Sequence, residues 1–154
     1  MIIKQITDPN FFTSSNFPEF VKSSIFETKY AEVGIVFDPT IISAEFISAT
    51  EDANKVCLVC MDGDKMVGIL LGEKTRIIFS KTPISEQRYV RIDENYRNKG
   101  IYSLLLAEFY KWSKLNNCVI MVAGSHVHTG DEKIRDIYKE KGFKPFHYNY
   151  YIEV

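Results

Sequence analysis

Hydrophobic and polar positions along this chain form alternating runs and continuous apolar runs, and both predict strands. "IIKQIT" near the N-terminus and "EQRYVRID" at 86–93 alternate, whereas "KVCLVCM" and "KMVGILLGE" are short apolar runs. Alternation predicts half-buried strands, and short apolar runs bounded by turn residues predict buried ones. The "DGDK" between the two apolar runs predicts a hairpin turn, in which Gly63 can take a positive φ.

Two further strands are expected near the C-terminus. "CVIMVAG" is apolar throughout, which predicts a central fifth strand covered on both faces. "PFHYNYYIEV" predicts a last strand, whose alternation places Phe146, Tyr148 and Tyr150 on one face. Because an aromatic edge strand tends to bury its surface, we expect a homodimer that uses this strand.

Local start and stop signals predict the helices. Asp38 suits an N-cap, with Pro39 at the first helical position. Thr129 and Glu132 form a capping box before a later helix, which Gly142 should end. The predicted helices run from near Pro18 to about Tyr30, from Pro39 within "FDPTIISAEFISATED", from Gly100 to about Leu115, and from Asp131 to Lys141.

The expected order of elements is therefore β-α-α-β-β-β-α-β-α-β. Antiparallel neighbours come first, and a β-α-β unit that must contain a parallel pair follows. The fold class is α+β, an α/β sandwich with a mixed, mostly antiparallel central sheet flanked by helices. At 154 residues, the chain is predicted to form one domain, 1–154.

Composition and charge narrow the class of protein. The chain is 45% hydrophobic and 25% charged, and its net charge is −1. These values are typical of a soluble globular protein without a general attraction to nucleic acid or an anionic membrane. No apolar run reaches the roughly 20 residues that span a bilayer. "MIIKQITDPN" turns polar too early for a signal peptide, so three cysteines suggest reduced thiols and a cytoplasmic location.

Cys57 and Cys60 form a CxxC within a predicted buried strand. Residues three apart on a strand point to opposite faces, whereas a redox or zinc pair needs both sulfurs together. We therefore expect both cysteines to be small core residues.

The stretch Arg97-Asn98-Lys99-Gly100-Ile101 joins a predicted strand to a predicted helix. It could be an ordinary polar turn. It could also hold phosphate, because a helix start offers unpaired N–H groups and a partial positive charge. Arg97 and Lys99 add formal charge, and Gly100 lets an anion approach the backbone without a Cβ in the way.

The stretch resembles the acetyl-coenzyme A loop of the GNAT family of N-acetyltransferases, in which Arg/Gln-x-x-Gly-x-Gly/Ala opens a helix after a strand. Ile92, Tyr96, Arg97, Gly100 and Ile101 fall on matching positions. A second family element, Tyr-x-x-x-Gly-Phe at the end of a short helix, is present as "YKEKGF". The two motifs occur in the order that the family requires, and the resemblance covers nearly the whole chain.

The resemblance implies an N-acetyltransferase with acetyl-coenzyme A as cosubstrate and an amine as acceptor. The acetyl group would move by direct attack, without a covalent enzyme intermediate. Backbone groups of one strand would pair with the pantetheine arm, and the loop would hold the diphosphate. The implied coenzyme-binding residues are Val90, Arg91, Ile92, Arg97, Asn98, Lys99, Gly100, Ile101 and Tyr102.

Tyr102 departs from the family pattern, which has Gly or Ala at this position. Its side chain could crowd the phosphate, point away along the helix or stack near the nucleotide. Simple surface packing is an equal alternative. The departure bears on the fine geometry of binding more than on binding itself, because the donors are backbone groups.

Two candidate catalytic residues remain. By the resemblance, Tyr138 protonates the departing thiolate, and a Tyr pKa of about 10 keeps its proton available at neutral pH. Its alternative is a core tyrosine beside Ile134 and Ile137 at helical spacing. Glu86 occupies the position where some family members carry a glutamate base, and Arg88, two residues on, could pair with it.

The remaining alternatives concern histidines, acceptor and activity. His126 and His128 follow the fifth strand and could act as a base. A metal site from them with Asp131 or His147 is conceivable, but no metal is predicted. The acceptor could be a small molecule or a protein amine. A non-catalytic acyl-coenzyme A-binding module is the alternative function, and a nucleic-acid-modifying variant would need a basic stripe that the sequence lacks.

Overall fold

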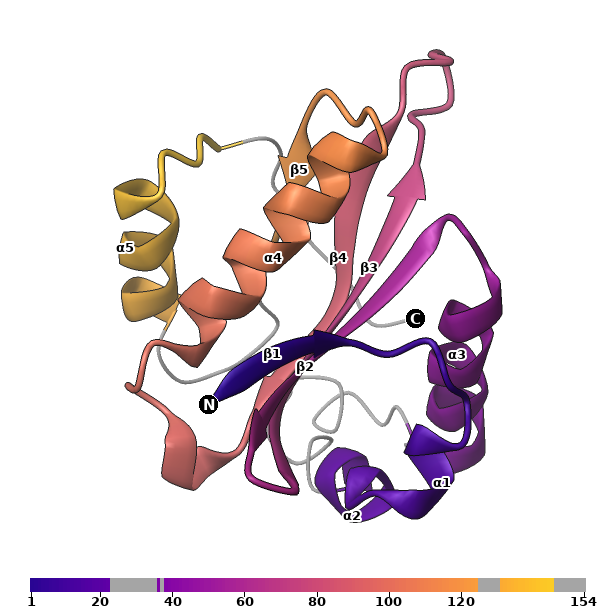
Figure 1. Cartoon of the computed structure of the whole chain (residues 1–154). Coiled ribbons are helices and arrows are strands. Elements are labelled where there is room, and N and C mark those ends of the chain that lie inside the picture. The colour runs from indigo at the N-terminus through magenta and orange to yellow at the C-terminus, as the bar shows by residue number, and fades with distance from the viewer. Residues whose placement is uncertain (23–35, 37, 125–130, 146–154) are drawn as a thin grey trace.

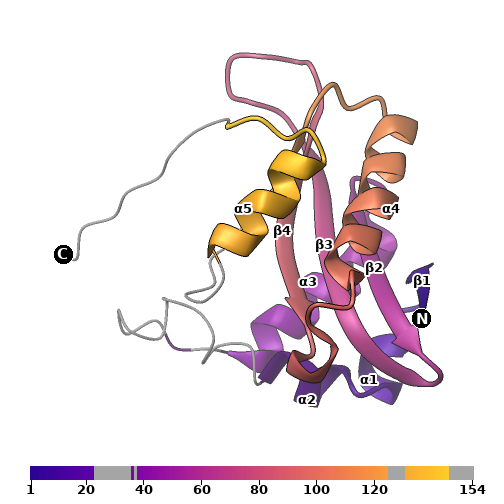
Figure 2. The same ribbon diagram turned by 90° about the vertical axis from the view of Figure 1, so that its left-hand side faces the viewer.

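The computed structural model describes residues 1–22, 36, 38–124 and 131–145 of the chain. Within them, one sheet lies between two groups of helices (Figures 1 and 2). The strands are β1 (Ile2–Gln5), β2 (Lys55–Asp62), β3 (Lys65–Thr75), β4 (Ile84–Ile92) and β5 (Met121–Val122). The helices are α1 (Phe11–Ser14), α2 (Phe17–Lys22), α3 (Pro39–Glu51), the 3₁₀ turn η3 (Glu94–Tyr96), α4 (Ile101–Leu115) and α5 (Asp131–Glu140).

The five strands lie in the order β1-β2-β3-β4-β5. The first four are antiparallel neighbours, and β5 pairs with β4 in parallel. Gly63, with φ +60°, occupies the tight turn between β2 and β3. The mixed, mostly antiparallel sheet with flanking helices confirms the predicted fold class.

One face of the sheet is covered by α1, α2 and α3. Each of these helices contributes a buried phenylalanine, Phe12, Phe17 and Phe46 respectively. The ring centroids of Phe12 and Phe17 are 4.9 Å apart, and those of Phe17 and Phe46 are 5.0 Å apart. These edge-on contacts bring the helices together over β2 and β3.

The opposite face is covered by α4, with α5 beside it (Figure 2). Leu105, Leu106 and Phe109 of α4 are buried there. Cys60 belongs to this core, whereas Cys57 belongs to the core under α1–α3. The two thiols therefore lie on opposite faces, as predicted, and burial raises the pKa of each.

The predicted helix caps at Asp38 and Gly142 are confirmed. The Asp38 carboxylate accepts a hydrogen bond of 2.8 Å from the Thr40 N–H at the start of α3. Gly142 has φ +79°. The Phe143 N–H donates to the Tyr138 carbonyl at 2.9 Å, and the Gly142 N–H to the Lys139 carbonyl at 2.9 Å. This pair of bonds is a Schellman motif, which ends α5.

The prediction of a long buried fifth strand over 118–124 is wrong. β5 is two residues long, Val119 is 65% exposed, and Ile120 is 39% exposed. The reason lies in the end of α4, where Asn117 takes φ +58° and the Cys118 N–H donates back to the Ser113 carbonyl. Residues 118–120 are therefore used in the return from the helix to the sheet.

Some predictions near the termini differ from the structure or fall outside it. The short helix α1 was not predicted, because its turn-rich sequence hides it. The helix expected from Pro18 to Tyr30 is seen as α2 up to Lys22. The rest of that helix, the Thr129 cap, the three histidines and the last strand with its predicted dimer contact lie outside the described residues. No helix in the described part of the chain is long and apolar enough to cross a membrane.

Candidate active site

The chain between β4 and α4 forms a compact loop that is held by hydrogen bonds within the loop. The Asp93 carboxylate accepts a bond of 2.9 Å from the Asn95 N–H and so caps η3. Asn98 and Gly100 then take positive φ, 62° and 75°. These two positions turn the chain so that α4 begins directly after Gly100.

The start of α4 is open. Its first intrahelical bond is from the Leu104 N–H to the Gly100 carbonyl, at 3.1 Å. The N–H groups of the first three helical residues precede this bond, and no side chain in the described residues caps them. A Cβ built on Gly100 would find no atom within 4 Å. This geometry fits a bound anion, because donors, dipole and open space coincide.

Cations are held beside the open helix start. The Lys99 ammonium lies over the Tyr96 ring, 4.4 Å from its centroid. The Tyr96 hydroxyl donates to the Asp62 carboxylate at 2.9 Å, and this bond raises the pKa of Tyr96. The Tyr96 ring is thus fixed, and it orients Lys99. Arg97 is exposed, so both predicted cations are accessible to an anion.

β4 contains a β-bulge at Arg88. Leu71 of β3 pairs with Tyr89 and Gly72 pairs with Gln87, so Arg88 has no opposing residue on β3. The extra residue puts two successive side chains, Arg88 and Tyr89, on the face covered by α1–α3. Period-two counting along this strand therefore holds up to Arg88 and fails between Arg88 and Tyr89.

The predicted strand residues divide between the two faces. Val90 and Ile92 pack in the core under α4. Arg91 faces the other side, where its guanidinium lies 5.2 Å from the Phe20 ring centroid. The pairing of β4 with β5 covers Ser85 and Glu86, whereas β4 itself runs on to Ile92. The side chains of Val90, Arg91 and Ile92 therefore point to different faces. Their backbone groups lie in the part of β4 beyond its pairing with β5.

Tyr102 lies in the first turn of α4, and the residue is 9% exposed. It points between α4, β4 and α5 rather than outward, so the surface-packing interpretation is wrong. Its hydroxyl donates to Gln87 Oε1 at 2.9 Å and is also hydrogen-bonded to the hydroxyl of Tyr138. Burial and the neighbouring Tyr138 raise the pKa of Tyr102 far above its usual value.

Tyr138 is half-buried on α5, where its ring packs 5.1 Å from that of Phe143. Burial raises the pKa of Tyr138, and the hydrogen bond with Tyr102 acts in the opposite direction. The tyrosine therefore holds its proton at neutral pH. Its hydroxyl contacts that of Tyr102, a residue of the first turn of α4.

Gln87 was not predicted from the sequence to be a site residue. Its amide nitrogen donates to the Gly124 carbonyl at 2.7 Å, so it ties β4 to the end of β5 while its oxygen accepts from Tyr102. A glutamine on a half-buried strand carries no local signal for such a role. The bulge, which sets the faces of β4, also has no signature in the sequence.

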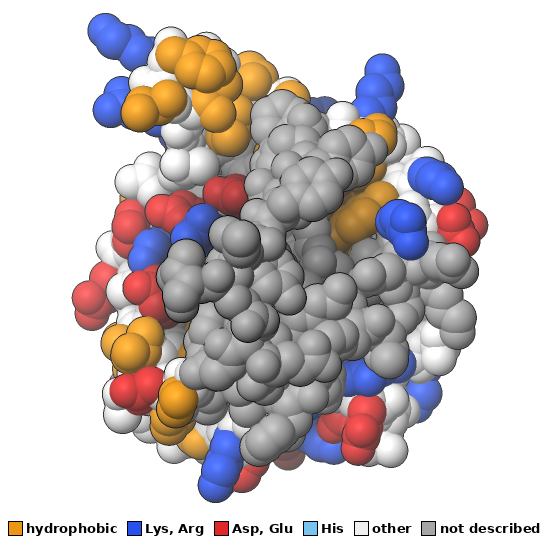
Figure 3. Space-filling view, turned by 180° about the vertical axis from the view of Figure 1, so that it is seen from behind, with side chains coloured by type: hydrophobic (Ala, Val, Ile, Leu, Met, Phe, Trp, Pro, Cys, Tyr) orange, Lys and Arg blue, Asp and Glu red, His pale blue; other side chains and the backbone are white. Residues whose placement is uncertain are grey.

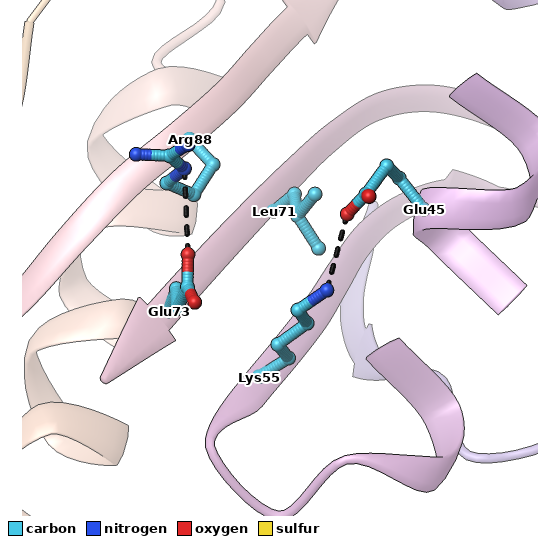
Figure 4. Close-up of a pocket in the computed structure, with 5 residues that line it drawn as sticks. All are labelled: Glu45, Lys55, Leu71, Glu73 and Arg88. Carbon is cyan, nitrogen blue, oxygen red and sulfur yellow. Dashed lines mark hydrogen bonds and ion pairs between the residues drawn. The ribbon is translucent and has the colours of Figure 1, made fainter. Parts of the chain in front are cut away.

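Glu86 lies on the face opposite to Tyr138. Its carboxylate pairs with Arg88 at 3.2 Å, as predicted, and Arg88 also pairs with Glu73 at 3.4 Å. A pocket of about 260 Å³ opens on this side. Figure 4 shows its lining residues, Glu45, Lys55, Leu71, Glu73 and Arg88. Figure 3 shows the molecule from behind, where acidic and basic side chains gather.

The sequence over residues 20–143 matches the Acetyltransferase (GNAT) family. The chain is a member of the GNAT family. The resemblance predicted from the two motifs is therefore confirmed. A search of curated proteins found no match.

Solved GNAT structures share the fold at low sequence identity. An aminoglycoside 6′-N-acetyltransferase from Acinetobacter haemolyticus superposes with a TM-score of 0.70 at 12% identity, covering 99% of this chain and 97% of the other. A ribosomal-protein-alanine N-acetyltransferase from Brucella melitensis gives 0.70 at 13%, covering both chains completely. An aminoglycoside N-acetyltransferase bound to a coenzyme A bisubstrate analogue gives 0.70 at 10%, covering 98% and 95%. The predicted cosubstrate, acetyl-coenzyme A, agrees with such complexes.

Proposed function

We propose that this GNAT protein is an N-acetyltransferase that moves an acetyl group from acetyl-coenzyme A directly to an amine. One observation carries the proposal. The hydroxyl of Tyr138 is hydrogen-bonded to that of Tyr102, a residue of the first turn of α4, the helix whose open start fits a diphosphate. An anion site and a proton donor thus lie together on one face of the sheet.

The chain's own groups would hold the coenzyme at three places. Backbone N–H groups of residues 98–102, at the start of α4, would bind the diphosphate, with Arg97 and Lys99 supplying charge. The backbone of Val90, Arg91 and Ile92 would pair with the pantetheine arm as an added strand does. Coenzyme held in this way places its thioester at the edge of β4 next to Tyr138.

Bound acetyl-coenzyme A supplies an acetyl thioester, and the protein's contribution is to position groups and move protons. Holding the two reactants together removes much of the entropic barrier. The Tyr138 Oη–H gives its proton to the departing sulfur. Because burial raises the pKa of Tyr138, the proton stays on the hydroxyl until the sulfur develops negative charge.

Glu86 is the proposed base on the other face of β4. Its carboxylate is 37% exposed and is held by Arg88, so it could accept the proton of an amine that enters from the side of α3. Glu86→Gln should reduce turnover by roughly 10²–10⁴. Glu73→Gln is the matched control, because Glu73 pairs with the same arginine. Equal turnover of both variants and the wild type would remove Glu86 from the mechanism.

The acceptor is proposed to be a small-molecule or protein amine. The named neighbours act on aminoglycosides and on a ribosomal protein, which spans both classes. The acidic and basic lining of the pocket beside Glu86 suits a polar amine. The connection between β3 and β4 projects beside this face with Ile78 and Phe79 exposed, and it would add apolar contacts (Figure 3).

The test is thiol release from acetyl-coenzyme A with a panel of amines. The panel includes polyamines, amino acids, aminoglycosides and peptides with a free N-terminus or lysine. We expect release well above background with at least one amine. Binding of acetyl-coenzyme A without release for any amine would favour the non-catalytic binding module, and absence of binding would overturn both functions.

A further inference from the structure

The orientation of the Gln87 amide fixes the direction of a hydrogen-bond chain. The Gly124 carbonyl can only accept, so the group that faces it at 2.7 Å must be the amide nitrogen of Gln87. The amide oxygen then faces Tyr102 at 2.9 Å. An amide oxygen cannot donate, so the single hydroxyl proton of Tyr102 is directed to Gln87.

The direction of the next bond follows from this. Since the proton of Tyr102 is used on Gln87, the bond between the two tyrosine hydroxyls must be donated by Tyr138. The chain runs from Tyr138 of α5 to Tyr102 of α4, then to Gln87 of β4 and the Gly124 carbonyl after β5. The proton that the proposed mechanism uses is therefore bonded to Tyr138 and directed at the oxygen of Tyr102.

We propose that Tyr102 is a positioning residue for Tyr138, which holds the Tyr138 proton before reaction and stabilises the Tyr138 oxygen after the proton has left. This inference rests on the proposed function and extends it to a residue where the family pattern has Gly or Ala. The tyrosine that replaces the usual Gly or Ala at position 102 thereby supports the proton transfer by Tyr138.

The proton balance of the step is complete. The Tyr138 hydroxyl first turns its proton from Tyr102 to the departing sulfur. The Tyr138 O–H bond then breaks, and the proton forms an S–H bond with the departing thiolate. The Tyr102 hydroxyl then turns from Gln87 to the negatively charged Tyr138 oxygen and donates to it. The proton that the amine loses returns to Tyr138 through solvent, so each turnover consumes and restores one proton on the tyrosine.

The surroundings of Tyr102 and Tyr138 explain why an ionised Tyr138 would need a neutral hydrogen-bond donor beside it. α4 presents Tyr102, β4 presents the uncharged Gln87, and the turn after α5 presents the Phe143 ring. Among the described residues, no charged side chain shifts the pKa of either tyrosine. Burial disfavours a phenolate, and within the described part of the chain the bond with Tyr102 is the one contact that offsets it. Because the pKa of Tyr102 is raised further by its neighbour, Tyr102 remains a donor when Tyr138 ionises.

The experiment compares Tyr102→Phe, Tyr138→Phe and the double variant in thiol release. Tyr102→Phe keeps the ring that packs 5.9 Å from that of Tyr138 and removes only the hydroxyl. We expect kcat to fall by roughly tenfold, the size of one lost hydrogen bond, with KM for acetyl-coenzyme A unchanged. The double variant should be no slower than Tyr138→Phe alone, because Tyr102 acts only through Tyr138. Tyr110→Phe, an exposed tyrosine on the same helix, is the control and should leave kcat unchanged.

A second measurement needs no substrate. The proton between the two hydroxyls should give a downfield resonance in the proton NMR spectrum, present in wild type and Tyr110→Phe and absent in both Tyr102→Phe and Tyr138→Phe. A wild-type kcat for Tyr102→Phe, or an equal loss in the Tyr138→Phe background, would overturn the proposed role. Full turnover of Tyr138→Phe would instead overturn the acid of the proposed function, and the NMR result would then report the hydrogen bond alone.

Discussion

The ring of Phe109 in α4 lies directly against the backbone of Gly72 in β3. A Cβ built on Gly72 would fall 2.2 Å from Cε2 of that ring, and two further ring atoms would lie within 2.8 Å. The absence of a side chain at Gly72 is therefore required, because it lets α4 pack close to the sheet. Gly68 has the same relation to Ile101, at 2.8 Å.

Gly72→Ala should destabilise the fold by about 1–3 kcal/mol, the usual cost of overpacking a core. Urea denaturation measures the change in the free energy of unfolding. Gly124→Ala is the control, because a Cβ there would meet no atom within 4 Å. Equal stability of Gly72→Ala and wild type would show that Phe109 can move aside without cost.

Gly100→Val should abolish coenzyme binding. Acetyl-coenzyme A at 100 times its Kd should stabilise the wild type by about 2.7 kcal/mol, and a branched side chain at Gly100 would occupy the anion's approach. Thermal unfolding with and without the coenzyme measures this gain. Gly63→Val is the matched control, because Gly63 also has positive φ and open space but lies in the β2–β3 turn. Both variants should lose stability from backbone strain, and only Gly63→Val should keep the gain from the coenzyme.

The two buried tyrosines should make stability fall at alkaline pH. The pKa of Tyr102 and that of Tyr138 are raised by burial, whereas an unfolded Tyr ionises near pH 10. Below about pH 10 both states hold these protons. Above it the unfolded state releases them and the folded state does not, so the free energy of unfolding decreases. Each tyrosine contributes a slope approaching about 1.4 kcal/mol per pH unit.

Denaturation of Tyr102→Phe across that pH range checks this linkage. With rising pH the free energy of unfolding should decrease less steeply for the variant than for wild type. The variant has one buried tyrosine hydroxyl fewer that keeps its proton in the folded state. Buried Cys57 and Cys60 also have raised pKa values, but they act equally in both proteins. Parallel pH profiles for wild type and Tyr102→Phe would contradict the burial of that hydroxyl.

Thiol reactivity should separate the cysteines. Cys118 is partly exposed, and Cys57 and Cys60 are both fully buried. In the native protein a thiol-specific chromogenic reagent should modify Cys118 first and the other two only on unfolding. Cys118→Ser should remove the first phase. A disulfide between Cys57 and Cys60 in native protein would be inconsistent with their places on opposite faces of β2.

Local patterns predicted much of this fold, and the parts that they missed depend on tertiary contacts. The hairpin at Gly63, the cap at Asp38 and the C-terminal turn at Gly142 each depend on residues close in the sequence, so they could be recognised there. The length of β5 could not, because it depends on how the chain returns from α4 to Pro83.

The candidate site divides in the same way. The anion loop was predicted, because its glycine and cations are adjacent in the sequence. The link between Tyr102, Gln87 and Tyr138 joins three elements, and only packing brings them together. Period-two counting correctly paired Glu86 with Arg88, but it could not show that the bulge also places Tyr89 beside Arg88.

The bulge at Arg88 makes that residue an insertion in a strand that would otherwise be regular. Gln87 on one side of it and Tyr89 on the other already face opposite sides of the sheet, as consecutive residues of an unbroken strand do. Removing Arg88 would therefore let the ladder close without turning any other side chain over. Insertion or deletion of a single codon could thus add or remove the arginine that pairs with Glu73 and Glu86. The face of the sheet next to Tyr102 and Tyr138 would be unchanged.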